Sequence, residues 1–247
     1  MEAGACMRKH LELVVPIGEG RPRPVSHLEA LIWAAENPGP QPKRNITRTR
    51  LLAATAKAMS TNAYFGLRVA DIAVAAGMSP AAFHVYFSDR KEAAREVLSG
   101  LLWRLYLVDP HDGRGGVRAF TLMIRRLLEA LQADAPLVRA LNHAVLVDEV
   151  VEELSDSAAR LWRARLNATL YGSEEGALRL GASPAPDALD LMVAGMIQRA
   201  GTPLLTPDAL SRLATEIGRA WLVVQGSPTA PGLAVSRRYG QVRPVHA

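Results

Sequence analysis

The stretch that decides the fold of this chain is VADIAVAAGMSPAAFHVYF, residues 69–87. Ile72 and Ala76 stand one helical turn apart in it, so residues 69–76 are predicted to form a short helix with a single apolar face. Gly77 follows, and glycine makes a tight turn because it adopts positive φ without a steric penalty. The chain is therefore expected to end one helix there and change direction before the next.

A second helix is predicted over residues 79–87. Ser79 is a typical N-cap, and Pro80 suits the first helical position because the N–H that proline lacks has no partner there. Phe83 and Phe87, one turn apart, are expected to pack on the first helix. The helix then turns a small, shallow face outward, made of Ala81, Ala82, His84, Val85 and Tyr86. Two helices joined in this way are typical of a helix-turn-helix, whose second helix can enter a DNA major groove; an ordinary helical hairpin is the alternative.

Helical periodicity extends over most of the chain. An apolar stripe from Ile46 to Met59 predicts a helix that ends before Gly66, and Ser88 and Asp89 can cap the helix that follows the motif. Further helices are predicted over residues 117–133, 134–147, 148–180, 187–200 and 206–225, of which the second is opened by Asp134 and Pro136 and the third begins at Asp148. Because no stretch alternates like a half-buried strand for more than a few residues, the predicted fold class is all-α.

The two ends of the chain differ from this helical part. Prolines at 16, 22, 24, 38, 40 and 42 indicate an irregular, flexible arm over residues 1–42, with at most one short helix near His27 to Glu36. Residues 226–247 lack helical periodicity and are expected to form a flexible tail. Between them we expect a first domain over residues 43–90 and a helical bundle over residues 91–225.

Composition and charge narrow the class of protein. The 247 residues are 49% apolar, which is enough for a sizeable core, and the net charge of +5 permits a polyanionic partner. The single cysteine, Cys6, excludes a disulfide framework and a cysteine-cluster metal site. Because no apolar stretch reaches the roughly 18 residues of a membrane span and no signal peptide is recognised, we expect a cytoplasmic protein with no membrane partner.

Catalytic and cofactor motifs are not found. The six histidines include no pair at the i, i+4 spacing of helix-borne zinc ligands, and the sequence has no Gly-x-Ser-x-Gly elbow, P-loop or dinucleotide fingerprint. We therefore expect no metal, no cofactor and no enzymatic activity. The alternative class is a helical small-molecule-binding or enzymatic domain that carries a vestigial helix-turn-helix.

From Arg48 to Ala94 the sequence resembles the DNA-binding domain of TetR-type transcriptional regulators. The resemblance rests on LLAATAKAMSTNAYFGLRV, then DIAVAAGMS, then FHVYF followed by SDRKEA. It implies a three-helix DNA-binding domain over residues 43–90. It also implies that the divergent helical domain over residues 91–225 holds an effector pocket and the dimer interface.

The resemblance also implies roles for individual residues. It makes Ser79 to Phe87 the recognition helix, and the residues placed where base edges are contacted are Pro80, Ala81, Ala82 and Val85. Tyr86 and Arg90 would contact phosphates, and His84, which replaces a common tyrosine, leaves room for a pH-sensitive contact. Because this face has almost no hydrogen-bonding side chain, base readout is expected to rest on thymine methyl groups.

A basic cluster precedes the helix-turn-helix, with no acidic residue between its ends: Lys43, Arg44, Arg48, Arg50 and Lys57. Two interpretations are open. The cluster can be a solvated helix face, or its side chains can lie along DNA phosphates, with Lys43, Arg44 and Arg48 as the candidates. The resemblance adds Arg68, which stands where the family often has a threonine that touches phosphate.

The candidate effector site lies among the helices after residue 100, where aromatic and methionine side chains reappear: Trp103, Tyr106, Phe120, Met123 and Trp162. Asn142 and His143, polar residues in an otherwise apolar helix, could orient a ligand. Because no buried pair of cations is evident, a small, neutral or weakly polar, apolar effector is expected. A plain hydrophobic core explains the same residues and stays open as the alternative.

The dimer interface is expected on the last two helices. Their apolar stripes are Leu189, Met192, Val193 and Met196 on one, and Leu213, Ile217 and Trp221 on the other. Paired stripes can form a four-helix interface across a two-fold axis, as a palindromic site in double-stranded DNA requires, although they can also be intramolecular core. Together with the resemblance, they predict a homodimeric repressor that a small apolar effector releases from a palindromic operator.

Overall fold

The computed structural model describes residues 26–106, 117–171 and 206–224, and this part of the chain is helical without a strand. Its helices are α2 (His27–Glu36), α3 (Lys43–Asn62), α4 (Val69–Ala75), α5 (Pro80–Phe83), α6 (Arg90–Tyr106), α7 (Val117–Ala133), α8 (Ala135–Val145), α9 (Glu149–Tyr171) and α12 (Pro207–Val224). The all-α prediction is confirmed. The helix predicted over residues 187–200 lies outside the described residues.

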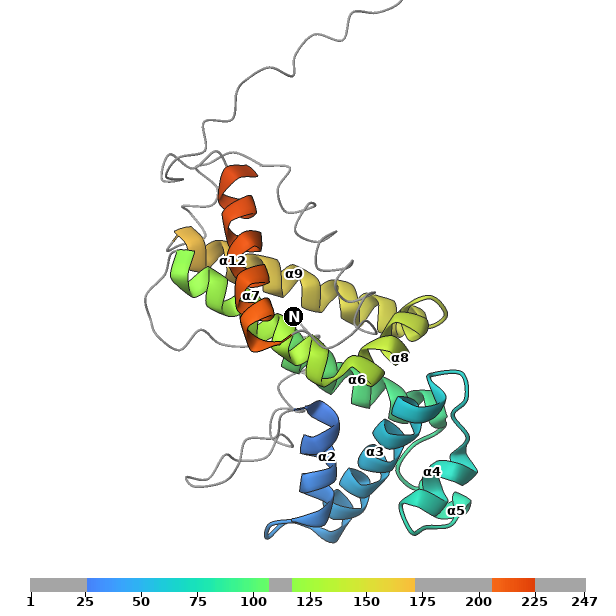
Figure 1. The fold of residues 1–247 in the computed structure, drawn as a ribbon. Helices are drawn as coiled ribbons and strands as arrows, with labels where there is room; N and C mark the ends of the chain where they lie inside the picture. The colour runs from blue at the N-terminus through green and yellow to red at the C-terminus, as the bar shows by residue number, and fades with distance from the viewer. Residues whose placement is uncertain (1–25, 107–116, 172–205, 225–247) are drawn as a thin grey trace, which may run out of the picture.

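The helices form two groups joined by α6 (Figure 1). Helices α3, α4 and α5, which we call the head, lie at the opposite end of the molecule from α12. Helices α7, α8, α9 and α12 form the body, in which α12 packs against α7 and α8 packs against α9. Helix α6 contacts α3 in the head and α7, α8 and α9 in the body. The head is therefore held to the body along α6 and by a direct contact between α3 and α8.

One continuous apolar core runs from the head through α6 into the body. It includes Ile72 and Phe83 in the head, Leu98 in the middle of α6, and Phe120 and Trp162 in the body, each almost fully buried. Helix α6 buries eight side chains: Ala93, Ala94, Val97, Leu98, Leu101, Leu102, Leu105 and Tyr106. Since burying one leucine contributes about 2 kcal/mol, α6 holds both groups together by packing.

Helix α2 corrects the prediction of a flexible arm over residues 1–42. The short helix expected near His27 to Glu36 is present, but it packs against α3 and α6, and His27 is buried. A capping box begins the helix: the Ser26 hydroxyl accepts from the Glu29 N–H, and the Glu29 carboxylate accepts from the Ser26 N–H, each at 3.1 Å. Residues 26–36 are therefore part of the packed fold.

Candidate nucleic-acid interface

The turn between α4 and α5 is built on Gly77. Its φ is 71°, where a side chain would be strained. The Gly77 N–H donates to the Val74 carbonyl at 3.0 Å, and the Met78 N–H donates to the Ala73 carbonyl at 2.8 Å. These two bonds close a Schellman motif, which ends α4 and fixes the direction in which the chain enters α5.

Helix α5 begins as its sequence predicts and ends earlier. The Ser79 hydroxyl accepts from the Ala82 N–H at 3.2 Å, and Pro80 is the first helical residue. The α-helix spans only Pro80–Phe83, because the next turn tightens: the N–H of Tyr86 donates to the carbonyl of Phe83, three residues back, at 2.9 Å. The predicted helix over 79–87 is thus one α-helical turn followed by a tighter turn.

Two phenylalanines anchor this segment in the head. Phe83 and Phe87 are 0% and 1% exposed, and their ring centroids lie 5.5 Å apart. Ile72 of α4 is fully buried in the same core, which confirms the predicted packing of the two helices. Because both rings point inward, the other side of the segment must face solvent.

The exposed side of the segment is small and mostly apolar. Ala81 and His84 are exposed, and Val85 is 69% exposed, although a buried position would stabilise its side chain. The Nδ1 atom of His84 lies 3.1 Å from the Ser88 carbonyl oxygen. Because a carbonyl oxygen only accepts, Nδ1 is the donor in this contact.

The side chain of Arg48 makes contacts within the protein and does not extend freely into solvent. Its guanidinium is hydrogen-bonded to both carboxylate oxygens of Glu96 on α6, and it lies over the ring of Phe87, 4.9 Å from the centroid. Such a bidentate pair is geometrically specific, so Arg48 ties α3 to α6 and to the end of the recognition segment. Of the three basic candidates on α3, it is the one that already pairs with a carboxylate of the protein.

Arg90 and Arg68 both lie at the loop before α4, Arg90 through contacts from α6 and Arg68 as its last residue. Arg90 donates to the carbonyl of Leu67 and, at 3.3 Å, to that of Phe65. It therefore fixes the loop that leads into α4, while the side chain stays exposed. Arg68 is exposed at the N-cap position of α4 and makes no side-chain cap there.

Lys43 and Arg44 stand where a cation is unfavourable for the helix itself. Both are exposed in the first turn of α3, which has no acidic residue, and the N-cap, Pro42, provides no side-chain hydrogen bond. The positive end of the helix dipole repels such charges by about 0.3–1 kcal/mol each. Arg50 and Lys57 continue the exposed row at seven-residue spacing. Because the first two of these cations lower the stability of the helix, the row of basic side chains is a candidate for binding an external anion such as DNA phosphate.

A polar clasp joins the head to the body at Asp148. This buried carboxylate accepts from the Tyr64 hydroxyl at 2.6 Å and from Arg95 Nε at 3.1 Å. The pKa of Tyr64 is raised by its burial and by the carboxylate it donates to. Burial alone would raise the pKa of Asp148, but the bonds from Tyr64 and Arg95 outweigh it and hold that pKa below its usual range. The clasp thus connects the end of α3, the first part of α6 and the start of α9.

A second clasp ties α2 to the body at Asp134. Its carboxylate oxygens accept from the His27 N–H at 2.7 and 2.9 Å and from the Leu28 N–H at 3.4 Å, and Arg104 Nε lies 3.4 Å away. With the capping box, these bonds satisfy the unpaired N–H groups at the start of α2. His27 Nε2 lies 3.1 Å from the Val97 carbonyl, and burial, helped by the charge of Arg104, lowers the pKa of His27 to about 4.

These two clasps are functional features that sequence reasoning missed. Asp134 and Asp148 were interpretable only as local starts of α8 and α9, where they do stand. The Asp134 side chain makes no cap on its own helix; it caps α2 instead, 107 residues away. A buried aspartate can be recognised only from the fold, because its partners are distant in the sequence.

The aromatic residues proposed for an effector site are mostly core. Trp162 and Tyr106 are 2% and 3% exposed, their rings meet edge to face at 6.0 Å, and Phe120 and Met123 are buried beside them. Trp103 and Asn142 are half-buried. His143, however, is exposed and stands 6.1 Å from the ring of Phe65 in the head. The structure therefore places His143 at the surface beside the head, and its role in orienting a ligand stays a prediction.

The residues proposed for the dimer interface fall largely outside the described part of the chain. These are Leu189, Met192, Val193 and Met196, together with the side chain of Trp221. On α12, Leu213 is 36% exposed, whereas Ile217 is buried in the core of its own chain. At least one residue of the predicted stripe is thus intramolecular core.

Two kinds of feature are absent from the described residues. None of the described helices is long and apolar enough to cross a membrane. Within the same ranges, no group of three or more histidine, cysteine, aspartate or glutamate side chains could hold a metal ion.

Comparisons with known proteins agree with this geometry. Residues 51–97 match the family described as bacterial regulatory proteins, tetR family, and no curated protein matches the sequence. The fold is similar to that of a Mesorhizobium loti MAFF303099 protein described as a TetR-family transcriptional regulator, at 17% identity and a TM-score of 0.58, over 74% of this chain and 98% of that one. A transcriptional regulator from Rhodococcus sp. Rha1 is similar at 23% identity and a TM-score of 0.56, over 71% of this chain and 96% of that one.

The head defines the class of protein: a helix-turn-helix with a capped second helix, two inward phenylalanines and an exposed outer face is a DNA-binding module. The family match covers this module: residues 51–97 are similar to bacterial regulatory proteins of the tetR family, and the two solved structures share the fold.

Proposed function

We propose that this protein is a transcriptional regulator of the TetR type, a repressor that binds a palindromic operator as a homodimer and leaves it when a small apolar effector binds. The observation that carries the proposal is the outer face of α5. Phe83 and Phe87 hold the segment on the head, so Ala81, His84 and Val85 are its outward groups. A face without long side chains can approach base edges closely in a major groove.

The charges around this face support the same proposal. Lys43 and Arg44 are exposed at the start of α3, and Arg68 is exposed at the start of α4. Phosphate contacts position a protein on DNA without reading its sequence, whereas base contacts specify the site. We therefore assign Lys43, Arg44 and Arg68 to phosphates, and Ala81 and Val85 to thymine methyl groups.

Binding to DNA from the gene's own upstream region tests the proposal. In a polarisation titration the protein should prefer one upstream fragment to unrelated DNA by at least about 1,000-fold. The double variant Lys43→Gln, Arg44→Gln should weaken both affinities alike and make the salt slope shallower by about two units. The matched control is Arg118→Gln, Arg139→Gln, which removes two exposed charges from the body. No preference for any upstream fragment would contradict the proposal.

The dimer is proposed to form through the stripe of residues 189–197 together with the exposed side of α12. Leu213, 36% exposed on α12, is a described side chain that supports this assignment. A two-fold axis between the two copies would match the symmetry of a palindromic operator. Met196→Glu should give monomers in light scattering, and an undiminished dimer would move the interface elsewhere.

The effector is proposed to enter among α6, α7 and α9, near the contact between Tyr106 and Trp162. A neutral apolar molecule suits this region because the buried side chains around it are apolar. A ligand there would displace α6, which bears Arg95 and Arg104 of the two clasps and so reaches the head. Trp162→Ala should weaken effector-driven release of DNA while leaving DNA affinity without effector nearly intact. If the variant only unfolds, Trp162 is core and the pocket lies elsewhere.

A further inference from the structure

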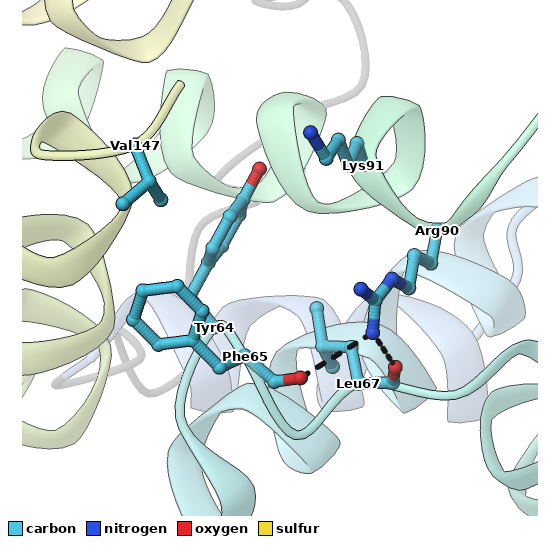
Figure 2. A pocket seen from close by; sticks show the side chains of 6 residues that line it. All are labelled: Tyr64, Phe65, Leu67, Arg90, Lys91 and Val147. Carbon is cyan, nitrogen blue, oxygen red and sulfur yellow. Dashed lines mark hydrogen bonds between the residues drawn. The ribbon is translucent and has the colours of Figure 1, made fainter.

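A pocket of about 210 Å³ lies at the junction of head and body (Figure 2). Three segments line it: the loop between α3 and α4, the first turn of α6, and the loop between α8 and α9. Its lining residues are Tyr64, Phe65, Leu67, Arg90, Lys91 and Val147. The pocket is separate from the Tyr106–Trp162 region, and it lies beside the Tyr64–Asp148 hydrogen bond.

One side of the pocket is apolar and unusually exposed. Phe65 is 60% exposed and Val147 is 49% exposed, and the neighbouring Leu146 is 81% exposed. Figure 2 shows Phe65 and Val147 on the same side of the pocket. Leaving such side chains in water forgoes about 25 cal/mol for each Å² that could be buried. Clustered exposed apolar side chains of this kind mark binding sites more often than chance positions.

The other side of the pocket is cationic. Lys91 is exposed, and its ammonium forms no ion pair among the described residues. Arg90 lies beside it with its guanidinium bonded to the Phe65 and Leu67 carbonyls, and three of its five N–H donors are left for other acceptors. The carboxylate behind Tyr64, Asp148, is neutralised by Arg95 at 3.0 Å, while Asp89 caps the Glu92 N–H. The side of the pocket that faces a ligand therefore carries net positive charge.

We infer that this pocket binds a small organic anion with an apolar, ring-sized body, and that the bound anion weakens operator binding. A cavity of 150 Å³ is known to hold benzene, so about 210 Å³ admits one ring with a short acidic group. The ring would lie against Phe65 and Val147, and the acid would pair with Lys91. The regulatory part of the inference rests on the proposed function, because it requires an operator.

The position of the pocket explains why occupancy would reach the DNA. A ligand in contact with Phe65 of the head and Val147 of the body would bridge the two groups next to the Asp148 clasp. It would also neutralise cationic charge next to Arg90, which the family resemblance assigns to a phosphate contact. Loss of this charge would weaken the DNA-bound arrangement more than the free one, which is the condition for coupling between two sites.

Calorimetric titration of the full chain with 4-methylbenzoate, and with its uncharged amide 4-methylbenzamide, tests the binding site. The acid should bind saturably, and the amide at least about 10-fold more weakly, since it lacks the charge that pairs with Lys91. Lys91→Gln and Phe65→Ala should each weaken the acid at least about 5-fold, which corresponds to about 1 kcal/mol. Arg139→Gln, an exposed charge change on α8, should leave its affinity unchanged. Absence of saturable binding, or equal binding by all variants, would overturn the site.

A second titration separates this inference from the proposed function. Operator DNA is titrated with protein in the presence and absence of 4-methylbenzoate, for the unaltered chain and for Phe65→Ala. The acid should weaken operator binding by the unaltered chain, and the effect should be lost in Phe65→Ala. An acid that binds in calorimetry without changing operator affinity would overturn the regulatory part. A chain that binds the acid but no upstream DNA would overturn the proposed function and leave the binding site standing.

Discussion

Asp148 is the residue on which the contact between head and body most depends. Its buried carboxylate accepts from Tyr64 and Arg95, and its pKa lies below the usual range. The charged form of the carboxylate is therefore more favoured in the folded chain than in the unfolded chain. The stabilisation is present above about pH 4 and is lost as the pH falls through the folded-state pKa.

Asp148→Asn should accordingly lower the free energy of unfolding at pH 7 by about 2–3 kcal/mol, since it leaves the two donors poorly paired. The difference from the unaltered chain should narrow as the pH falls below about 4, because the unfolded chain takes up a proton there first and the folded chain does so only at its lower pKa. Urea unfolding across this range checks both statements. The control is Asp156→Asn, an exposed aspartate on α9. A deficit that stays constant with pH would mean that the charge of Asp148 is not what stabilises the fold.

His27 also costs stability on acidification, but at higher pH than Asp148 does. Its pKa is lowered to about 4 by burial, so between about pH 6.5 and pH 4 the unfolded chain binds a proton that the folded chain does not. The unaltered chain should lose up to about 3 kcal/mol of stability on acidification through this window, at 1.36 kcal/mol per pKa unit. His27→Gln should lack this loss, whereas His84→Gln, an exposed histidine, should keep it. Identical acid profiles for all three would refute the assignment.

Helix α2 packs on α6 at Gly100, where the lack of a side chain leaves room for the ring of His27. A Cβ placed on Gly100 of α6 would lie 2.7 Å from Cε1 of the His27 ring. Gly100→Ala should therefore destabilise the chain by about 1–3 kcal/mol, although alanine favours a helix by about 1 kcal/mol over glycine.

The His27→Ala background provides the control for Gly100→Ala. With the ring removed, the clash is gone and only the helix propensity of alanine remains, so Gly100→Ala should become neutral or stabilising. Chemical unfolding of the four chains of this cycle measures the coupling. Equal effects of Gly100→Ala in both backgrounds would show that α2 does not pack through His27.

Local signals explain which elements could be predicted from the sequence. The Ser79–Pro80 start of α5, the turn at Gly77 and the paired phenylalanines were predictable because each depends on residues within one or two turns. The length of α5 could not be predicted, because no residue type in the sequence marks the tighter turn after Phe83. Proline content suggested a flexible arm, yet α2 is docked by the distant carboxylate of Asp134. The exposure of His143 likewise follows from how α8 packs, which its own apolar sequence does not specify.

In the molecule as a whole, two buried aspartates mark the two ends of α8 and pair with arginines of α6. Asp134 pairs with Arg104 and holds α2, and Asp148 pairs with Arg95 and holds Tyr64 of the head. A change in the position of α6 relative to α8 would therefore act on both attachments of the amino-terminal helices. This arrangement is suited to transmit a ligand's effect from body to head over a continuous packed core.

The most direct test of the account is the affinity of Val85→Glu for operator DNA, measured by fluorescence polarisation against the unaltered chain. Val85 is 69% exposed, so the variant should fold normally, while its carboxylate would face the DNA if α5 enters the groove. The matched control is Val150→Glu, 43% exposed in the first turn of α9, where the helix dipole favours a negative charge. The account predicts at least about a 30-fold loss of affinity for Val85→Glu, or about 2 kcal/mol, and none for Val150→Glu. Operator binding by a folded Val85→Glu that equals that of the unaltered chain would contradict the account, because α5 would then not be the element that reads DNA.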